Sequence, residues 1–322
     1  MTDIDRAVAV LRSGGLVAFP TETVYGLGAD ASNDAAVGRV FEVKGRPSDH
    51  PLIVHLSDAS HLDGWAANVS ANAKLLADAF WPGPLTLLLE RSTSVSSAVT
   101  GGRSTVGLRV PDHPVALELL RSFGGGIAAP SANRFGRVSP TTAAHVIADL
   151  GDDVDVVLDG GPCRVGVEST IVDLTSDRPV VLRAGGVSID RLEEVLGHSI
   201  DIFVSAEPSA GGARAPGMLE AHYAPNARVV LCAEHEIAEV LIEVLGSATG
   251  PVGLLAGSAL VGLPEDIVEL EPAGPADDYA AVLYSRLRQA DRLGLRVLVC
   301  VPPPEVGVGV AVNDRLRRAA AS

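Results

Sequence analysis

Four groups of polar side chains stand directly after short apolar runs, and they contain the residue types best suited to chemistry. The groups are Thr21-Glu22-Thr23, His55, Ser131-Ala132-Asn133 and Glu168-Ser169-Thr170. An apolar run that ends in polar residues is how α/β proteins place functional side chains at the end of a strand. If the strand ends converge, these hydroxyls, the amide and the imidazole line one cavity suited to a small polar substrate.

Four cations accompany these groups, at Lys44, Arg46, Arg109 and Arg183. A guanidinium binds a carboxylate with two parallel hydrogen bonds, and Arg and Lys both neutralise phosphate oxygens. Lysine occurs only twice in the chain, at Lys44 and Lys74. A lysine kept at position 44 suggests that a compact ammonium is needed there. We therefore expect a ligand that carries several phosphates, an amino-acid carboxylate, or both.

Each of these signals also has a structural explanation. Thr21 and Thr23 could be ordinary turn and strand residues. Ser131 and Asn133, after Pro130, could form a helix cap. Lys44 and Arg46 could complement the dipole at the end of a helix. His55 could be a half-buried histidine with no ligand, and Arg109 and Arg183 could form structural ion pairs. Residue type alone leaves these alternatives open.

No residue has the sequence context of a covalent nucleophile. Ser131 and Ser169 lack the G-x-S-x-G pattern, and the phosphate loop G-x-x-x-x-G-K-[ST] is absent. The three cysteines, Cys163, Cys232 and Cys300, form no C-x-x-C pair, which argues against a thiol-ligated zinc site and a disulfide framework. Nucleotide chemistry would therefore depend on positioning and charge stabilisation.

The elements that must position these residues do not alternate regularly. We expect strands at 16–19, 52–56, 85–90, 105–110, 127–129, 154–158, 169–173 and 180–183, with helices at 4–13, 33–43, 71–80, 115–122, 141–150 and 188–196. Gly26 and Gly28 are expected to bend the chain, and Lys44 and Arg46 to lie on a short loop. This pattern predicts an α/β fold with a mixed, twisted sheet and helices packed on it, rather than a pure βαβ repeat.

A change in composition near residue 201 predicts a second domain. Residues 207–217 are too rich in Gly, Pro and Ala to form an element. Beyond them, strands at 228–232, 252–255 and 297–301 alternate with helices at 236–245, 277–293 and 313–321, which is typical of a small three-layer, Rossmann-like domain. We assign residues 1–200 to an N-terminal domain, 201–226 to a linker and 227–322 to the C-terminal domain.

The bulk composition limits the function further. Hydrophobic residues make up 47% of the 322 residues, which is enough for a large core, and no apolar run is long enough to cross a bilayer. The acidic start Met1-Thr2-Asp3 lacks the basic residues of a signal peptide, so we expect a cytoplasmic protein. The net charge of -15 argues against strong direct binding of nucleic acid.

The sequences of the motifs and their order along the chain resemble those of a known family. The motifs are Pro20-Thr-Glu-Thr-Val-Tyr-Gly-Leu-Gly28, Lys44-Gly-Arg-Pro47, Pro51-Leu-Ile-Val-His55, Trp81-Pro-Gly-Pro-Leu-Thr86, Val106-Gly-Leu-Arg-Val-Pro111, Ala129-Pro-Ser-Ala-Asn133, Glu168-Ser-Thr170 and Leu182-Arg-Ala-Gly185. Together they are similar to the successive motifs of YrdC-like threonylcarbamoyl-AMP synthases. Ala215-Pro-Gly-Met218 and His222-Tyr-Ala-Pro225 resemble the linker of the longer, two-domain type, although Leu219-Glu220-Ala221 lacks the basic residues often found there.

The resemblance implies a nucleotidyltransferase that makes L-threonylcarbamoyladenylate and pyrophosphate from L-threonine, bicarbonate and ATP. The product would feed the formation of N6-threonylcarbamoyladenosine at position 37 of tRNAs that read ANN codons, through a downstream threonylcarbamoyl-transferase complex. Mg2+ would enter with ATP, and no residue is assigned as a metal ligand.

The resemblance also implies roles for individual residues. Lys44 and Arg46 would be the catalytic cations that face the phosphates. Threonine would be held by Thr21, His55, Arg109, Ala129 and Ser169, with Arg109 on its carboxylate. ATP would be held by Lys44, Ser48, Thr105, Ser131, Asn133, Ser139 and Arg183, and by Tyr223, which would close over the site from the linker.

Three other functions compete with this one. A non-catalytic RNA-binding protein is disfavoured by the net charge and by the lack of aromatic residues near the cations. The carbamoyl-transfer role of a similar domain in hydrogenase maturation needs cysteine-rich zinc modules that three scattered cysteines cannot supply. A relative that cleaves such adenylates would be separated by a threonine-dependent exchange of pyrophosphate into ATP.

Overall fold

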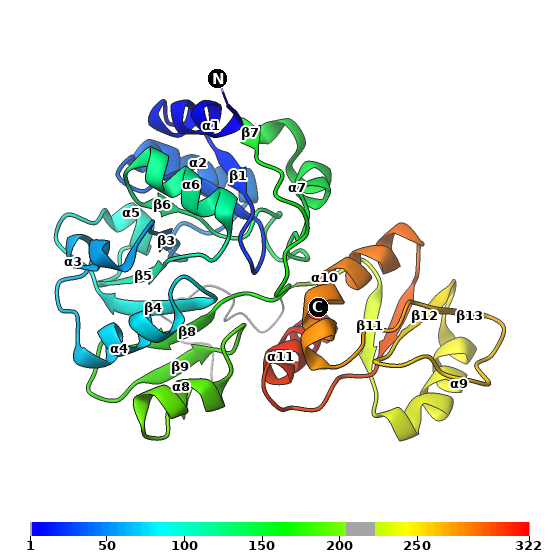
Figure 1. Ribbon diagram of the computed structural model, residues 1–322. Helices are drawn as coiled ribbons and strands as arrows, with labels where there is room; N and C mark the ends of the chain where they lie inside the picture. Colours follow the sequence, from blue (N-terminus) through cyan, green and yellow to red (C-terminus); the bar gives the residue numbers. More distant parts are fainter. Residues whose placement is uncertain (1, 204–222, 322) are drawn as a thin grey trace. The chain divides into compact units, whose positions relative to one another are not determined.

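The computed structural model describes residues 2–203 and 223–321, which form two compact units (Figure 1). The larger unit holds the described residues up to 203, except for Gly136–Val138 and Val165–Val167. Those two segments belong with the described residues from 223 onward, which form the smaller unit. The domain limits at 200 and 227 stay predictions, because most of the expected linker lies outside the described residues.

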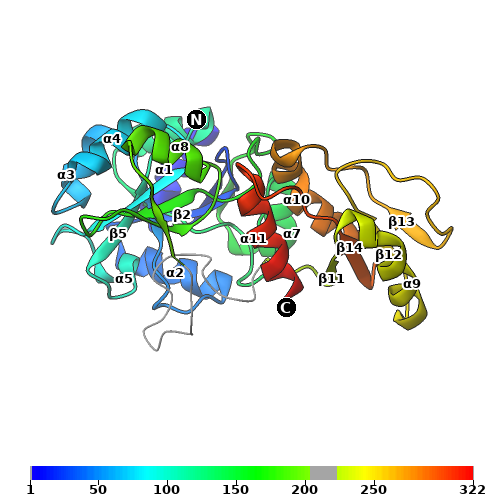
Figure 2. The same cartoon turned by 90° about the horizontal axis from the view of Figure 1, so that it is seen from below.

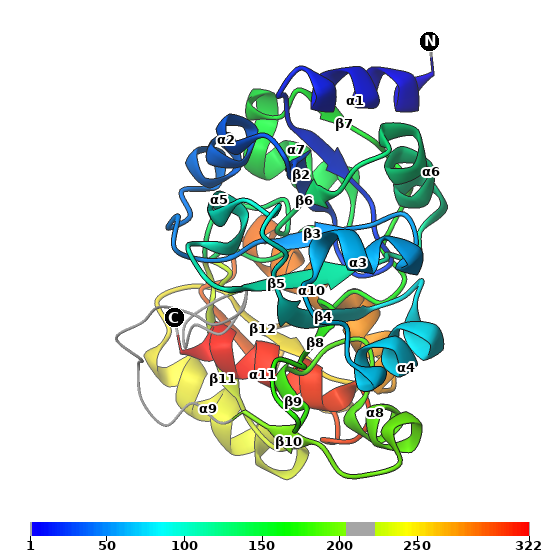
Figure 3. The same ribbon diagram turned by 90° about the vertical axis from the view of Figure 1, so that its left-hand side faces the viewer.

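Within the described residues, ten strands of the larger unit form one sheet in the order β10-β9-β8-β4-β5-β3-β6-β2-β1-β7. Figure 3 shows this sheet from β7 and β1 at the top to β10 at the bottom. The strands are β1 Val17–Phe19, β2 Gly26–Asp30, β3 Ile53–His55, β4 Leu85–Glu90, β5 Thr105–Arg109, β6 Ile127–Ala128, β7 Val156–Val157, β8 Thr170–Asp173, β9 Val180–Arg183 and β10 Asp201–Ile202. Parallel pairs such as β3 with β5 and antiparallel pairs such as β3 with β6 confirm the predicted mixed sheet.

Most helices of the larger unit begin after a residue whose side chain caps a backbone amide, and several end at a glycine. They are α1 Asp3–Arg12, α2 Asp34–Lys44, α3 Leu62–Trp65, α4 Ala71–Phe80, α5 Ser97–Thr100, α6 Pro114–Phe123, α7 Ala143–Leu150 and α8 Ile189–Leu196, with short 3-10 helices at Ala59–His61 and Gly151–Asp153. Asn33 caps α2 by accepting from the amides of Ala35 and Ala36, and Gly45 ends the helix with a φ of 64°. Lys44 is therefore the last residue of α2, and the prediction that it lies on a loop was wrong.

The expected bend at Gly26 and Gly28 is instead an antiparallel hairpin. Gly26 to Asp30 form β2, which pairs with β1 in the register Val17 with Gly28 and Phe19 with Gly26. Neither glycine has a positive φ. A Cβ atom on Gly28 would lie 2.7 Å from Ile127 and 2.8 Å from the Phe19 ring. The glycines are thus needed for close approach of neighbouring side chains rather than for a turn.

The two faces of the larger sheet have different surroundings. Val54, Leu87 and Leu108 point into the main core, together with apolar residues of α2, α4 and α8. Ile53 and Leu88, which alternate with them, belong to a separate small cluster on the other face. Along β1, β2 and β6, that second face is covered by α1 and α6.

The smaller unit has a parallel sheet between helices, as predicted for the C-terminal domain. Within its described residues, β11 Arg228–Leu231, β14 Val297–Cys300, β12 Val252–Leu255 and β13 Ile267–Glu269 are neighbours in that order. Figures 1 and 2 show α9 Ile237–Ser247 on one side of this sheet and α10 Ala276–Arg292 and α11 Gly309–Ala320 on the other. A short 3-10 helix, Glu234–Glu236, precedes α9. The strand β13 was not predicted; it is a three-residue edge strand that is largely exposed.

No helix in the part of the chain that the structure describes is long and apolar enough to span a membrane.

Candidate active site

Strand alternation brings several of the predicted site residues to one face of the larger sheet. His55 lies two residues after Ile53 in β3, and Arg109 follows Leu108 in β5, so both side chains lie on the face opposite the main core. Ser169 stands two residues before Ile171 of the same small cluster and reaches the same face. The predicted convergence of strand carboxyl ends is too simple, because β1 and β6 run opposite to β3 and β5.

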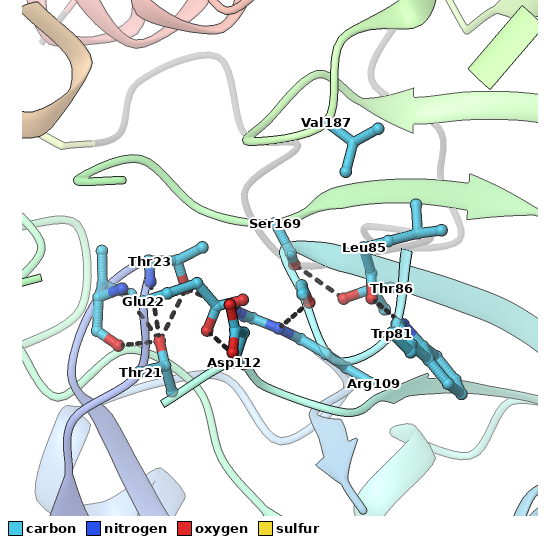
Figure 4. Close-up of polar contacts among 12 residues, drawn as sticks. Thr21, Glu22, Thr23, Trp81, Leu85, Thr86, Arg109, Asp112, Ser169 and Val187 are labelled. Atoms are coloured by element: carbon cyan, nitrogen blue, oxygen red, sulfur yellow. Dashed lines mark hydrogen bonds and ion pairs between the residues drawn. The ribbon is translucent and has the colours of Figure 1, made fainter. Parts of the chain in front are cut away.

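Arg109 is the centre of a buried polar network (Figure 4). Its Nη2 atom lies 2.8 Å from Glu22 Oε1 and donates to Thr23 Oγ1 at 2.9 Å, while its Nε donates to the Gly83 carbonyl at 3.3 Å. Glu22 is fully buried, and its other oxygen accepts from the Asp112 amide at 3.0 Å. Arg109 Nη1 makes no hydrogen bond to the residues that the structure describes. The guanidinium is therefore fixed on one edge and free to bind an anion through Nη1.

Thr21 takes part in this network through its neighbour. Its hydroxyl donates to the Val24 carbonyl at 2.7 Å, accepts from two amides of its own loop and lies 2.8 Å from Thr23 Oγ1. The structural explanation for Thr21 is thus correct as far as the loop is concerned, since the hydroxyl closes a local turn. Thr23, which was not assigned a role, connects this turn to Arg109.

His55 is neutral in this environment. Its side chain is 3% exposed, and its ring meets the edge of the Phe19 ring at 5.6 Å between centroids. Burial, followed by the nearby charge of Arg109, lowers the pKa of His55 to about 3. Its Nδ1 atom has no hydrogen-bond partner among the described residues. The unprotonated nitrogen of a neutral imidazole can accept a hydrogen bond from an N–H or O–H group of a ligand.

Ser169 is held from two sides. Its hydroxyl lies 2.8 Å from Thr86 Oγ1 of β4 and accepts from Arg183 Nη2 at 3.1 Å. Arg183 also donates to the Ser169 carbonyl, from Nε at 3.1 Å and from Nη2 at 2.9 Å. A predicted ATP residue, Arg183, and a predicted threonine residue, Ser169, are therefore in direct contact. Nearby in the chain, the buried Ser139 donates to Glu168 at 2.7 Å.

Lys44 is buried at the end of α2, where its ammonium donates to the Ser131 carbonyl at 2.6 Å and to the Asn133 carbonyl. Burial, and then the charge of Arg46, hold the pKa of Lys44 well below the usual value for lysine. The structure thus brings together Lys44 with Ser131 and Asn133, all predicted to bind ATP. The ammonium shapes this loop as well as offering a positive charge.

Arg46 is held by the loop that follows it. It donates to the Pro51 carbonyl at 3.0 Å, and its guanidinium lies 5.9 Å from the centroid of the Phe135 ring. His50, which packs edge-on against the same ring, has its pKa lowered by burial and then by the charge of Arg46. The Arg46 side chain is therefore fixed, and its charge acts on Lys44.

The remaining predicted residues differ in their surroundings. Ala129 is buried, and its amide donates to the Ile53 carbonyl at 2.9 Å. Thr105 is half-buried at the start of β5, and Ser48 is exposed; the described contacts join neither of them to the networks above. Tyr223 belongs to the smaller unit, where it stacks on Tyr284 at 5.7 Å and lies under the Arg315 guanidinium at 5.1 Å.

Sequence reasoning missed three residues of the site: Glu22, Thr23 and Thr86. Glu22 and Thr23 stand in the first polar group, but only their contacts with Arg109 reveal a role. Thr86 lies inside an apolar strand, where a threonine usually serves packing. The available signal was that Thr86 points to the same face as Leu88, hence away from the core.

The His, Cys, Asp and Glu side chains of the described residues do not form a site for a protein-bound metal ion. In the described ranges no group of three or more His, Cys, Asp or Glu side chains could hold an ion. The two carboxylates next to the networks are engaged, Glu22 by Arg109 and Glu168 by Ser139. The residues therefore do not fit a protein-held Mg2+ site.

The arrangement defines a class of protein: a two-unit α/β protein whose larger unit contains a group of buried cations and hydroxyls. A family model described as telomere recombination, named for Sua5, YciO and YrdC, matches residues 9–185. A second, described as the C-terminal domain of threonylcarbamoyl-AMP synthase, matches residues 187–321.

Similar proteins agree over nearly the whole chain. The threonylcarbamoyl-AMP synthase of Pyrococcus abyssi is 41% identical over 327 residues, which cover 97% of this chain and 92% of the relative. That of Bacillus subtilis is 41% identical over 321 residues, with 98% and 92% covered. The crystal structure of P. abyssi Sua5 complexed with L-threonine matches with a TM-score of 0.91 at 41% identity, covering 99% of this chain and 95% of that one. The chain belongs to the Sua5/YrdC family of threonylcarbamoyl-AMP synthases, and the expected family, fold class and enzyme class are confirmed.

Proposed function

We propose that this chain makes L-threonylcarbamoyladenylate and pyrophosphate from L-threonine, bicarbonate and ATP. The observation that carries the proposal is the free Nη1 edge of Arg109, on the sheet face that also carries His55 and Ser169. A relative of nearly the same length binds L-threonine, which supports a threonine site in this chain.

Threonine would use three kinds of group in this site. Its carboxylate would pair with Arg109 Nη1 and with the hydroxyl of Ser169. The open Nδ1 of neutral His55 would accept a hydrogen from the amine or the hydroxyl of the substrate. A neutral imidazole suits a substrate amine, because an imidazolium would repel an ammonium and could not accept its hydrogen.

ATP would lie toward Lys44, Arg46 and Arg183. The threonine amine captures bicarbonate to give a carbamate with loss of water, and a carbamate oxygen then attacks the α-phosphorus. The bond from that phosphorus to the bridging oxygen breaks, and pyrophosphate leaves with the electron pair. Fixed cations stabilise the charge that grows on the phosphate oxygens. Mg2+ would arrive as part of the MgATP substrate, bound by phosphates and water.

The product would serve the threonylcarbamoyl modification of adenosine 37 in tRNAs that read ANN codons. A downstream transferase complex would consume it, and this chain would not itself need to hold tRNA. The family name of the relatives supports the adenylate product.

The linker is part of the proposal as a lid, because a mixed carbamoyl-phosphate anhydride hydrolyses readily and a closed site would exclude water. Residues 204–222 lie outside the described residues, so this role remains a prediction. Deleting the linker and the C-terminal domain should sharply reduce product formation in a mass-spectrometric assay. Unchanged turnover would contradict the lid.

The decisive experiment is incubation of the chain with ATP, Mg2+, bicarbonate and each amino acid in turn, followed by mass detection of the adenylate. We expect the threonyl product to dominate, with serine as the nearest competitor. Formation of no adenylate, or of one without preference for threonine, would refute the proposal.

A further inference from the structure

The hydroxyl of Ser169 has a buried partner to which no role is assigned, the hydroxyl of Thr86. Thr86 lies in the middle of the apolar strand β4, is 0% exposed and cannot itself touch a ligand in this arrangement. Its Oγ1 atom lies 2.8 Å from Ser169 Oγ and has no other hydrogen bond within the described part of the chain. Figure 4 shows Thr86 beneath Ser169, with Arg109 on the same side of the strands.

The direction of this hydrogen bond decides what Ser169 can do. A hydroxyl has one hydrogen and two acceptor positions. Ser169 Oγ already accepts from Arg183 Nη2, because a guanidinium can only donate. If Ser169 donated to Thr86, the Thr86 hydrogen would be buried with no acceptor among the described residues, which is costly. If Thr86 donates instead, Ser169 accepts twice and its own hydrogen remains for a ligand.

An anionic ligand group next to Ser169 satisfies every hydrogen in the second arrangement. A carboxylate is an acceptor only, so it would take the free Ser169 hydrogen while Arg109 Nη1 pairs with it from β5, on the other side of β4. Thr86 then donates to Ser169, and Ser169 donates to the carboxylate, so each hydrogen bond has one donor and one acceptor. Consecutive hydrogen bonds of this kind strengthen one another in a site without water.

We propose that Thr86 is a positioning residue that orients the Ser169 hydroxyl as a hydrogen-bond donor to the substrate carboxylate. The inference rests on the proposed function, since it takes threonine to be the molecule that Arg109 and Ser169 hold. Thr86 acts only through Ser169, so its removal should affect threonine and leave ATP binding nearly unchanged.

The test compares initial rates of adenylate formation for the full chain and for Thr86→Val, Thr86→Ser, Ser169→Ala and the double variant Thr86→Val/Ser169→Ala. Valine has the shape of threonine without the hydroxyl, and serine keeps the hydroxyl. For Thr86→Val we expect the threonine KM to rise about fivefold to tenfold, as for the loss of one buried hydrogen bond. The ATP KM should stay within about twofold, and Thr86→Ser should restore the threonine KM to within about twofold of the wild type.

The double variant separates positioning from packing. If Thr86 acts through Ser169, the effect of Thr86→Val should vanish in the Ser169→Ala background. The same fold-change in both backgrounds, or a Thr86→Val enzyme with an unchanged threonine KM, would overturn the inference. If Thr86→Val does not fold, Thr86→Ala takes its place in the same cycle. A wild-type chain that forms no threonyl adenylate would refute the proposed function and this inference with it, whereas an active wild type leaves the cycle to decide the inference alone.

Discussion

At the scale of single residues, the orientation of Arg109 depends on Glu22. A glutamine at position 22 has one acceptor where glutamate has two, so its amide hydrogens must face either the Asp112 amide or Arg109 Nη2. In either orientation two hydrogen-bond donors face each other, and the contact that fixes the Arg109 guanidinium is weakened. We expect Glu22→Gln to raise the threonine KM about tenfold or more and to lower the free energy of unfolding by about 3 kcal/mol.

Steady-state kinetics and urea unfolding measure these two effects. Glu118→Gln, an exposed change on α6, is the matched control and should alter neither quantity. If Glu22→Gln lost stability but kept the threonine KM of the wild type, the ion pair would be purely structural.

Lys44 offers a second test at this scale, because the chain has only one other lysine, the exposed Lys74. Burial and Arg46 lower the Lys44 pKa, so this ammonium should release its proton at a lower pH than an ordinary lysine near 10.4. The unfolded chain keeps that proton to higher pH, and the stability contributed by this group therefore rises as the pH passes upward through the folded pKa. Phosphates of ATP favour the charged form and should raise the pKa.

Carbon-13 NMR of the lysine Cε atoms measures this directly, with Lys74→Arg to identify the two signals. We expect the Lys44 signal to titrate below pH 10.4 and to move upward with a nonhydrolysable ATP analogue. A Lys44 signal that titrates as in a free peptide, with and without nucleotide, would show that the ammonium is neither buried nor near phosphate.

At the scale of elements, the β1–β2 hairpin depends on Gly28. An alanine there would bring its Cβ to 2.7 Å from Ile127 and 2.8 Å from Phe19, two side chains packed under α1 and α6. We expect Gly28→Ala to lower the free energy of unfolding by about 1–3 kcal/mol, as in other overpacked cores. Gly38→Ala in α2 is the matched control: nothing lies within 4 Å of its Cβ, and alanine should be neutral or stabilising by about 1 kcal/mol. Equal stabilities of the two variants in urea would refute this account.

Much of the fold could be predicted from local sequence, and the exceptions have physical causes. Strands such as β4 and β5 were placed from their apolar runs, and α2 from its cap at Asn33. The strand β2 was missed because Gly26 and Gly28 look like turn residues, whereas the neighbouring aromatic ring requires them in a strand. That requirement comes from a packing partner and is absent from the local sequence.

The site was predictable in its residue types and less so in its contacts. Alternation within β3 and β5 places His55 and Arg109 on one face, which local pattern can suggest. The partners Glu22 and Thr86 could not be derived, because they depend on which strands are neighbours and on how the loop after β1 meets Arg109. Long-range order of this kind decides which polar residue acts and which one positions it.

At the scale of the whole molecule, the charge distribution favours binding of small anions and disfavours binding of nucleic acid. The chain carries 40 acidic and 25 basic residues, for a net charge of -15. The cations of the site, Lys44, Arg46, Arg109 and Arg183, are all buried and bonded to protein groups. Buried cations can bind a substrate that enters the site, but they cannot follow the backbone of a folded RNA.

This distribution leads to a prediction about binding of tRNA, the molecule that the proposed product would serve to modify. We expect fluorescence anisotropy to give a Kd above about 100 μM for tRNA in 150 mM salt, at the weak end of non-specific binding. The control is the same titration in 20 mM salt, where a protein that neutralises several phosphates gains affinity steeply and this chain should gain little. Tight binding whose affinity falls steeply with salt concentration, as for the release of several counterions, would contradict this prediction. It would mean that the surface has a basic region that binds tRNA, and that the protein delivers its product to the tRNA directly. Weak binding at both salt concentrations would leave transfer to a separate partner, because an adenylate released from a buried site must then cross solution before it meets the nucleoside.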